Sequence, residues 1–205
     1  MRTYIDEEAL MKLIQRQGYL DFLRRNRNRP IVKVVSGIRR CGKSTLFRLF
    51  KDELLSEGVK PEQIISINFE ELEYEHLREY HALYQYILER MQPDEMNYIF
   101  LDEIQHVDQF HRVVDSLFVK ENTDLYITGS NAYFMSSDIA TLLTGRYVEI
   151  QMLPLSFSEF YHSKYDGNQY SLIPAYESYL RESSFPYKQQ LGGEDFDIKE
   201  YLRGL

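Results

Sequence analysis

The chain has 205 residues and a net charge of −8, and 43% of its residues are hydrophobic, so it can bury a full core in one or two domains. This acidic balance argues against a general nucleic-acid coat protein. The single cysteine, Cys41, excludes an intramolecular disulfide, and the sequence contains neither a secretory signal pattern nor an apolar run that could span a membrane. We therefore expect a cytoplasmic protein with no membrane partner.

The charge is distributed unevenly along the chain. Between Arg16 and Arg48 there are ten lysines and arginines but one acid, Asp21, which gives a local balance of +9. Two interpretations are open for the basic residues that precede the first predicted strand: a face that contacts DNA or an acidic neighbouring subunit, or a solvated helix face. These residues are Arg16, Arg24, Arg25, Arg27 and Arg29.

The first predicted elements are a helical segment and a strand. Leucine and isoleucine recur at spacings of three and four over residues 7–25, which predicts a helix that Gly18 can divide in two. Polar residues and Pro30 separate this helix from a β-branched run at 31–36, the first predicted strand. A second helix is predicted over 45–55.

Four further strands are predicted, separated by helical patterns and polar loops. The strands are expected at 63–69, 98–101, 124–128 and 147–152, an acidic surface loop at 70–75, and helices at 77–91, 109–119 and 134–143. Parallel strands need long crossover connections, so this alternation predicts an α/β fold with a parallel sheet and helices on both faces.

The C-terminal part has weaker periodicity. Ser156 and Glu159 have the spacing of a capping box at the start of a helix. Residues 163–171 are predicted as a loop, with helices near 172–182 and 198–205. We expect three regions, with a further domain after Leu205: an Arg-rich helical segment at 1–29, a core at 30–153 and a helical part at 154–205.

A glycine-containing motif lies between the first strand and the helix that follows it. The sequence Gly37-Ile-Arg-Arg-Cys-Gly-Lys-Ser44 matches G-x-x-x-x-G-K-[ST], the phosphate-binding P-loop, at every fixed position. Glycines let the backbone approach a phosphate, and the N–H groups of the loop and of the helix N-terminus attract negative charge. Lys43 adds a charge for the β- and γ-phosphates, and the Ser44 hydroxyl can bind Mg²⁺. We expect ATP to be held by Gly37, Ile38, Arg39, Arg40, Cys41, Gly42, Lys43, Ser44 and Thr45.

An acidic pair, Asp102 and Glu103, ends the predicted strand at 98–101, about 60 residues after the P-loop. At that position Asp102 can hold Mg²⁺ beside Ser44, and Glu103 can orient and deprotonate a water that attacks the γ-phosphate. A pair of solvated loop carboxylates is the alternative. The pair favours an ATPase over a kinase, which does not need a water-activating glutamate, and the chain lacks the Asn-Lys-x-Asp motif of GTPases.

Other candidate residues follow the fourth strand and the acidic pair. Asn131, or Ser130 beside it, can contact the γ-phosphate or the water, unless both belong to a plain turn. Arg146 is a candidate arginine finger, in cis or in trans across a subunit interface, or else a cap on the fifth strand. Gln105 and His106 can contact the water or relay the nucleotide state, or else lie at the surface at the start of a helix.

These motifs together resemble one family. The P-loop followed by Thr45, Asp-Glu-Ile-Gln after a strand, Thr-Gly-Ser-Asn, and Leu-Thr-Gly-Arg before Pro-Leu-Ser-Phe-Ser-Glu-Phe are similar to the predicted prokaryotic AAA+-superfamily ATPases. In that family the ATPase domain precedes a nuclease-like C-terminal domain of unknown function. The resemblance covers residues 15–160.

The resemblance implies a five-stranded sheet of order 5-1-4-3-2. It carries over Lys43, Ser44, Asp102, Glu103 and Asn131 by position, and Arg146 as the finger. The sequence departs from the pattern in two ways: the second half of the family's architecture is absent, and only Arg181 is available, as a weak candidate, for the sensor-2 arginine of a helical lid.

We expect Mg²⁺-dependent hydrolysis of ATP to ADP and phosphate, coupled to a C-terminal or partner domain; Arg146 can act in trans in a homo-oligomer or in cis. The alternative is a slow nucleotide-gated switch, or a DNA- or protein-binding module with little turnover that uses the basic segment Arg16–Arg29.

Overall fold

The computed structural model describes residues 14, 16–130, 143, 145–165, 170–181 and 186. These residues form two compact units. The sheet unit consists of the described parts of 18–38 and 43–152, and the second unit of the described parts of 1–17, 39–42 and 153–205. None of the helices in the described part of the chain is long and apolar enough to cross a membrane.

The sheet unit contains five parallel strands in the order β2-β3-β4-β1-β5. The strands are β1 (Val32–Gly37), β2 (Ile64–Asn68), β3 (Asn97–Asp102), β4 (Thr123–Gly129) and β5 (Tyr147–Met152). Each predicted strand is confirmed to within one residue, and so is the order 5-1-4-3-2. The fold is the expected α/β fold of a P-loop NTPase.

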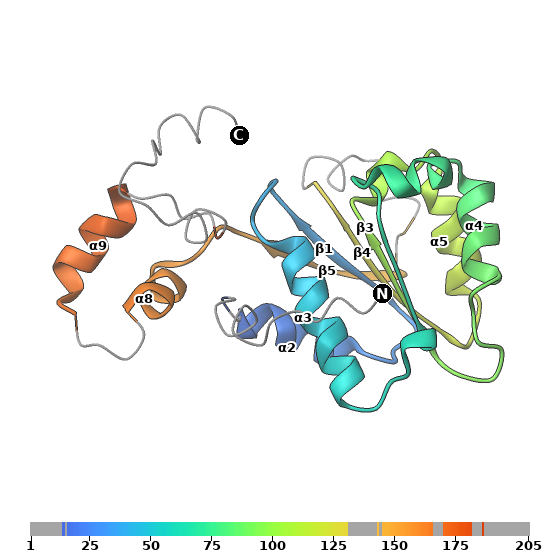
Figure 1. Ribbon diagram of the computed structural model, residues 1–205, viewed down its shortest axis with the longest axis horizontal. Coiled ribbons are helices and arrows are strands. Elements are labelled where there is room, and N and C mark those ends of the chain that lie inside the picture. The colour runs from blue at the N-terminus through green and yellow to red at the C-terminus, as the bar shows by residue number, and fades with distance from the viewer. Residues whose placement is uncertain are drawn as a thin grey trace. The chain divides into compact units, whose positions relative to one another are not determined.

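Helices cover both faces of this sheet, because neighbouring parallel strands need crossover connections. Figure 1 shows α2 and α3 on one face and α4 and α5 on the other. These helices are α2 (Gln17–Asn26), α3 (Lys43–Ser56), α4 (Tyr80–Leu88) and α5 (Phe110–Phe118). Three short 3₁₀ segments, η1 (Pro61–Gln63), η2 (Leu72–Leu77) and η3 (Ile104–His106), complete the connections.

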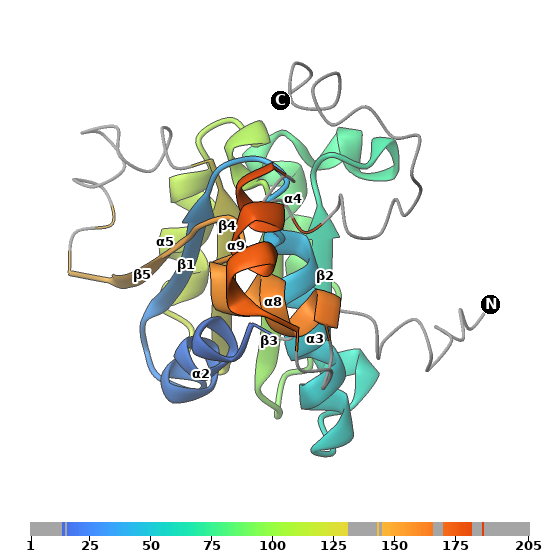
Figure 2. The same ribbon diagram turned by 90° about the vertical axis from the view of Figure 1, so that its left-hand side faces the viewer.

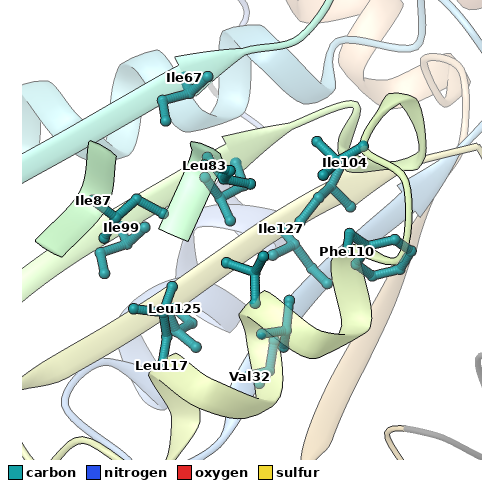
Figure 3. Packing of buried hydrophobic residues seen from close by; sticks show 14 of the residues in the cluster. Val32, Ile67, Leu83, Ile87, Ile99, Ile104, Phe110, Leu117, Leu125 and Ile127 are labelled. Carbon is teal, nitrogen blue, oxygen red and sulfur yellow. The ribbon is translucent and has the colours of Figure 1, made fainter. Parts of the chain in front are cut away.

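The main hydrophobic core lies between the sheet and the α4–α5 layer (Figure 3). Side chains alternate along a strand, so Ile99 and Leu101 of β3 point into this core while Phe100 points to the other face. The labelled members of the core in Figure 3 are Val32, Ile67, Leu83, Ile87, Ile99, Ile104, Phe110, Leu117, Leu125 and Ile127.

Aromatic side chains fill the opposite face, beneath α3. The rings of Phe100 and Tyr126 stack with their centroids 4.7 Å apart, and Phe47 of α3 meets Phe100 edge-on at 5.2 Å. Beside them the fully buried ammonium of Lys33 pairs with the carboxylate of Asp124. A buried charge needs such a partner, and this pair joins the amino-terminal halves of β1 and β4.

The second unit contains α8 (Phe157–Tyr165) and α9 (Leu172–Arg181), which lie side by side in Figure 2. Phe157 packs edge-on against the ring of Tyr176 at 5.1 Å. The predicted capping box is confirmed: the Glu159 N–H donates to the Ser156 hydroxyl at 3.2 Å, and the Ser156 N–H donates to the Glu159 carboxylate at 2.8 Å.

Two predicted loops are wrong. Residues predicted as an acidic loop at 70–75 include most of η2, and α8 continues through Tyr165 into the loop predicted at 163–171. Both segments are amphipathic enough to bury one side, Leu77 in the first and Phe160 in the second. The helix predicted at 198–205, and the one at 134–143 except Leu143, lie outside the described residues.

Candidate functional site

The phosphate-loop sequence connects β1 directly to α3. Gly42 has φ 104°, a left-handed value that a residue with a Cβ rarely adopts, and Arg40 has φ 63°. Helix α3 begins at Lys43, so its first N–H groups have no partner within the helix. The loop therefore has the backbone bends and the helix start that an anion-binding loop needs.

Lys43 is held at the carboxyl-terminal edge of the sheet. Its side chain is 3% exposed, and its ammonium donates to the carbonyl oxygens of Gly37 at 3.2 Å and Ile38 at 3.3 Å. The same Nζ lies 3.0 Å from Oε1 of Glu103. The two residues that the sequence assigns to phosphate binding and to water activation are thus brought into contact.

The acidic pair ends β3, and a residue of β4 joins its two members. The Thr128 hydroxyl donates to the carboxylate of Asp102 and accepts a hydrogen bond from the Glu103 N–H at 2.8 Å. All three side chains are nearly or fully buried. The sequence analysis missed Thr128, although it lies in the Thr-Gly-Ser-Asn motif, because its contacts with the acidic pair join positions 25 and 26 residues apart and exist only in the folded sheet.

Glu103 has a backbone conformation that is uncommon for a residue with a side chain, with φ 55° and ψ 49°. The Gln105 side-chain amide donates to Glu103 Oε2 at 2.5 Å, so both carboxylate oxygens of Glu103 are engaged. Gln105, one of two residues predicted to contact the water, relay the nucleotide state or lie at the surface, thus contacts the candidate base, and its part in the reaction stays a prediction. His106 ends η3.

Asp102 and Ser44 lie together, as expected of two ligands to one metal ion. The Ser44 hydroxyl hydrogen-bonds the Asp102 carboxylate. Burial raises the pKa of the Asp102 carboxyl above its ordinary value, against the hydrogen bonds from Ser44 and Thr128. A buried carboxylate with a hydroxyl beside it suits Mg²⁺, which binds one or two protein oxygens together with waters and phosphates. The described residues contain no cluster of three or more His, Cys, Asp or Glu that could hold a metal unaided.

A hollow of about 440 Å³ opens beside Ser44 and Asp102. Lys51, two turns beyond Ser44 on α3, borders this hollow and donates to the Ser66 hydroxyl at 2.7 Å. Burial lowers the pKa of the Lys51 ammonium. The remaining lining residues are Thr45, Phe47, Arg48, Asn68, Glu71 and Tyr74. Ser44 and Asp102 are the two predicted metal ligands, and both line this hollow.

Two predicted residues at the end of β4 have different outcomes. Ser130 follows Gly129, the last residue of β4, at the same carboxyl-terminal edge as Asp102. Asn131, the favoured residue, lies outside the described residues. Its contact with the γ-phosphate stays a prediction.

Arg181, the weak candidate for the sensor-2 arginine, ends α9. Its side chain is 80% exposed, and its Nη2 lies 3.8 Å from Oε2 of Glu177.

Arg146 lies at the opposite edge of the sheet. Its carbonyl accepts a hydrogen bond from the Val32 N–H at the start of β1, and its guanidinium pairs with Asp115 of α5 at 2.7 Å. The length of β1, about 17 Å, separates Val32 from Gly37. An arginine side chain is shorter than that strand, so this arrangement favours the trans alternative, or a cap on the fifth strand, over action in cis. The trans alternative stays a prediction.

Two arginines of the basic segment form ion pairs within the sheet unit. Arg24 forms a bidentate pair with Glu53 of α3 at 2.6 and 2.7 Å, and Arg27 pairs with Glu57 and donates to the Tyr98 hydroxyl. Arg24 remains exposed on α2, as the solvated-face interpretation expects, and a DNA contact by Arg24 or Arg27 stays a prediction. Arg25 and Arg29 are exposed, and neither forms an ion pair within the described part of the chain.

Arg16 is the clearest correction to the predicted DNA contact. Its side chain is 5% exposed and forms an ion pair with Glu159, which lies 143 residues further along the chain. A residue so covered cannot neutralise the phosphates of a duplex. The periodicity of 7–25 placed it on a helix, whereas the described helix α2 begins at Gln17.

Comparison with known proteins identifies the family. A family model described as an AAA domain matches residues 29–161, and the chain belongs to this family. The chain is 42% identical over 176 residues to an uncharacterized protein of Haemophilus influenzae, covering 85% of this chain and 44% of that protein. It is 31% identical over 190 residues to an uncharacterized protein of Methanocaldococcus jannaschii, covering 85% and 40%. The chain thus spans less than half the length of these curated relatives.

Solved structures share the fold at low identity. The crystal structure of Saccharomyces cerevisiae RIF2 aligns with a TM-score of 0.51 and 14% identity, covering 83% of this chain and 72% of that one. The S. cerevisiae Hsp104:casein complex aligns with a TM-score of 0.51 and 12% identity, covering 85% and 34%. At these identities the likeness concerns the fold alone, and it agrees with an AAA-type P-loop domain.

Proposed function

We propose that this member of the AAA domain family binds ATP together with Mg²⁺ and hydrolyses it to ADP and phosphate. The observation that carries the proposal is the contact between Lys43 and Glu103, 3.0 Å apart at the carboxyl-terminal edge of the sheet. A phosphate-binding lysine and a water-activating glutamate are useful together only where a γ-phosphate is cleaved by water.

Each side chain in the site has a role in this proposal. Lys43 moves from Glu103 to the β- and γ-phosphates when ATP enters, and Glu103 then accepts the proton of the attacking water. Thr128 holds the Glu103 backbone and the Asp102 carboxylate in register. Ser44 and Asp102 hold Mg²⁺, which supplies charge neutralisation at the phosphate oxygens when bound.

The relatives extend well beyond the region that aligns with this chain. Because the relatives are more than twice the length of the aligned region, we infer that hydrolysis drives a conformational change that passes to the rest of such a chain. We also propose that Arg146 acts on the nucleotide of a neighbouring copy, where it would stabilise the charge on the transferring phosphoryl group.

One observation favours a slow nucleotide-gated switch as a second candidate function. Both carboxylate oxygens of Glu103 are engaged, one by Lys43 and one by Gln105. Each contact stabilises the ionised carboxylate, so both make Glu103 a weaker base until they loosen. An isolated chain that fails to loosen them would bind ATP and turn it over rarely.

The test is phosphate release from Mg-ATP by the wild type and by Glu103→Gln, with ATP binding measured on both. An exposed residue of η1, Glu62, provides the matched control as Glu62→Gln. Turnover by the wild type and the control, with binding but no turnover by Glu103→Gln, would support the ATPase. Binding by all three without turnover would support the switch, and absence of binding would overturn both.

A further inference from the structure

Arg16 makes contacts to three separate parts of the chain. Its guanidinium forms a bidentate pair with Glu159 of α8, with Nε 2.8 Å from Oε1 and Nη2 3.1 Å from Oε2. Nη1 donates to the carbonyl of Leu153 at 2.6 Å and to that of Cys41 at 3.2 Å, and Nη2 donates to the carbonyl of Pro154 at 3.2 Å. All five residues belong to the second unit.

The chemistry of these contacts requires an arginine. A planar guanidinium presents donors in fixed directions, so it can bind a carboxylate along one edge and carbonyl oxygens along another. The ammonium of a lysine is a compact charge with three donors and cannot reproduce that arrangement. Because Arg16 is only 5% exposed, the contacts also compensate for the removal of its charge from water.

The contact to Cys41 bears on the phosphate loop itself. The carbonyl of Cys41 and the N–H of Gly42 belong to one planar trans peptide group, in which the two bonds point in opposite directions. A hydrogen bond that fixes the direction of the carbonyl therefore fixes the direction of the Gly42 N–H. That N–H follows the left-handed residue Arg40 by two positions and lies directly before Lys43.

The contact to Glu159 bears on α8. Glu159 also closes the capping box with Ser156, so the carboxylate that binds Arg16 fixes the first turn of this helix. Burial opposes the charged form of Glu159, but hydrogen bonds from Arg16 and Ser156 outweigh it, and the pKa of the carboxyl lies below its ordinary value. The carboxylate is thus the form that both contacts stabilise.

We infer that Arg16 is a positioning residue that orients the phosphate loop and couples its occupancy to the segment of residues 153–165. A ligand that draws the Gly42 N–H toward a phosphate changes the direction of the Cys41 carbonyl, and Arg16 transmits that change to Glu159 and to the start of α8. This inference rests on the proposed function, because it requires a nucleotide in the loop.

The test measures ADP affinity by titration, well below the unfolding temperature, for the wild type, Arg16→Lys, Glu159→Gln and the double variant. Glutamine also closes a capping box, so Glu159→Gln keeps the helix start and removes the charge that binds Arg16. The matched controls are Arg181→Lys and Glu177→Gln, an exposed and weakly paired arginine and glutamate on α9.

We expect Arg16→Lys to weaken ADP binding by roughly tenfold, the loss of about one charge-assisted hydrogen bond. Glu159→Gln should weaken ADP binding by several-fold, although Glu159 contacts the phosphate loop only through Arg16. The double variant should bind ADP no more weakly than Arg16→Lys does. In the wild type, ADP should slow amide hydrogen exchange over residues 157–165, and in Glu159→Gln it should not.

A purely structural role gives a different result. If Arg16→Lys and Glu159→Gln lower the unfolding temperature but bind ADP as tightly as the wild type, the inference is overturned and the proposed function stands. If the wild type itself does not bind ADP, the proposed function fails and the inference fails with it. Should Arg16→Lys not fold, the comparison of Glu159→Gln with its control still decides.

Discussion

Lys43 and Glu103, the two groups that the proposed reaction needs at the γ-phosphate, are paired with each other, with Nζ and Oε1 3.0 Å apart. Both side chains are buried, at 3% and 7% exposure, so each charge compensates for the cost of removing the other from water. ATP must therefore compete with Glu103 for Lys43. Loss of the Glu103 charge should therefore change the affinity for ATP.

Glu103→Gln should bind ATP more tightly than the wild type, by roughly three- to tenfold, because Lys43 no longer has an ionic partner to leave. Hydrolysis should fall at least a hundredfold, since the amide is not a base. Isothermal titration with Mg-ATP and phosphate release measure the two effects on the same preparation. Weaker ATP binding by the variant would contradict the proposed competition.

Thr128→Val removes the hydroxyl that joins Asp102 to the Glu103 backbone while keeping the shape of the side chain. Two buried groups lose their partner, so we expect turnover to fall by roughly ten- to a hundredfold and stability to fall by about 1–3 kcal/mol. Thr128→Ser keeps the hydroxyl and is the control. Equal turnover by the two variants would show that the hydroxyl does not position the site.

The position of Arg146 predicts complementation between inactive variants. Glu103→Gln and Arg146→Ala should each be inactive alone, and a mixture should recover part of the turnover, because one copy would supply the base and its neighbour the arginine. Asp115→Asn removes the exposed partner of Arg146 but keeps the finger, so it should retain activity and lose little stability. A mixture as inactive as its components would argue against action in trans.

The arginines of the basic segment should separate into two groups. Arg24→Gln breaks an ion pair with Glu53 of α3, and Arg27→Gln breaks one with Glu57 just after that helix, so each should lower the free energy of unfolding by up to about 1 kcal/mol in urea titrations. Arg25→Gln and Arg29→Gln should change it by less than about 0.5 kcal/mol. If the chain binds DNA, only the second pair should weaken a mobility shift, and an effect confined to the first pair would contradict this assignment.

Acidic pH should reduce the contribution of the Glu159 carboxylate to the stability of the fold. Its pKa in the folded chain lies below the ordinary value of 4.5, so the contribution is complete above that value and is lost as the pH falls through the folded pKa. The difference in unfolding temperature between the wild type and Glu159→Gln should therefore be constant near neutral pH and shrink below about pH 4.5. Thermal scans by circular dichroism measure it, and a difference that grows with acid would contradict the sign.

The sequence was sufficient for the elements that depend on local patterns. Apolar β-branched runs identified the five strands to within a residue, and the fixed spacing of Gly37, Gly42, Lys43 and Ser44 identified the loop. Asp102 and Glu103 end a strand, so they are expected at the same edge of the sheet as the phosphate loop, because the carboxyl ends of parallel strands meet there. The order of the strands came from the resemblance to a family and not from periodicity.

The partners of charged side chains were decided only by the tertiary structure. The sequence shows that Arg16 and Arg24 are charged, but it does not show their partners. Glu159 lies 2.8 Å from Arg16, and Glu53 lies 2.6 Å from Arg24. Nor does it show that Thr128 bridges the acidic pair. Strand and helix patterns repeat over a few residues and can be read locally, whereas an ion pair joins positions up to 143 residues apart and exists only once the chain has folded.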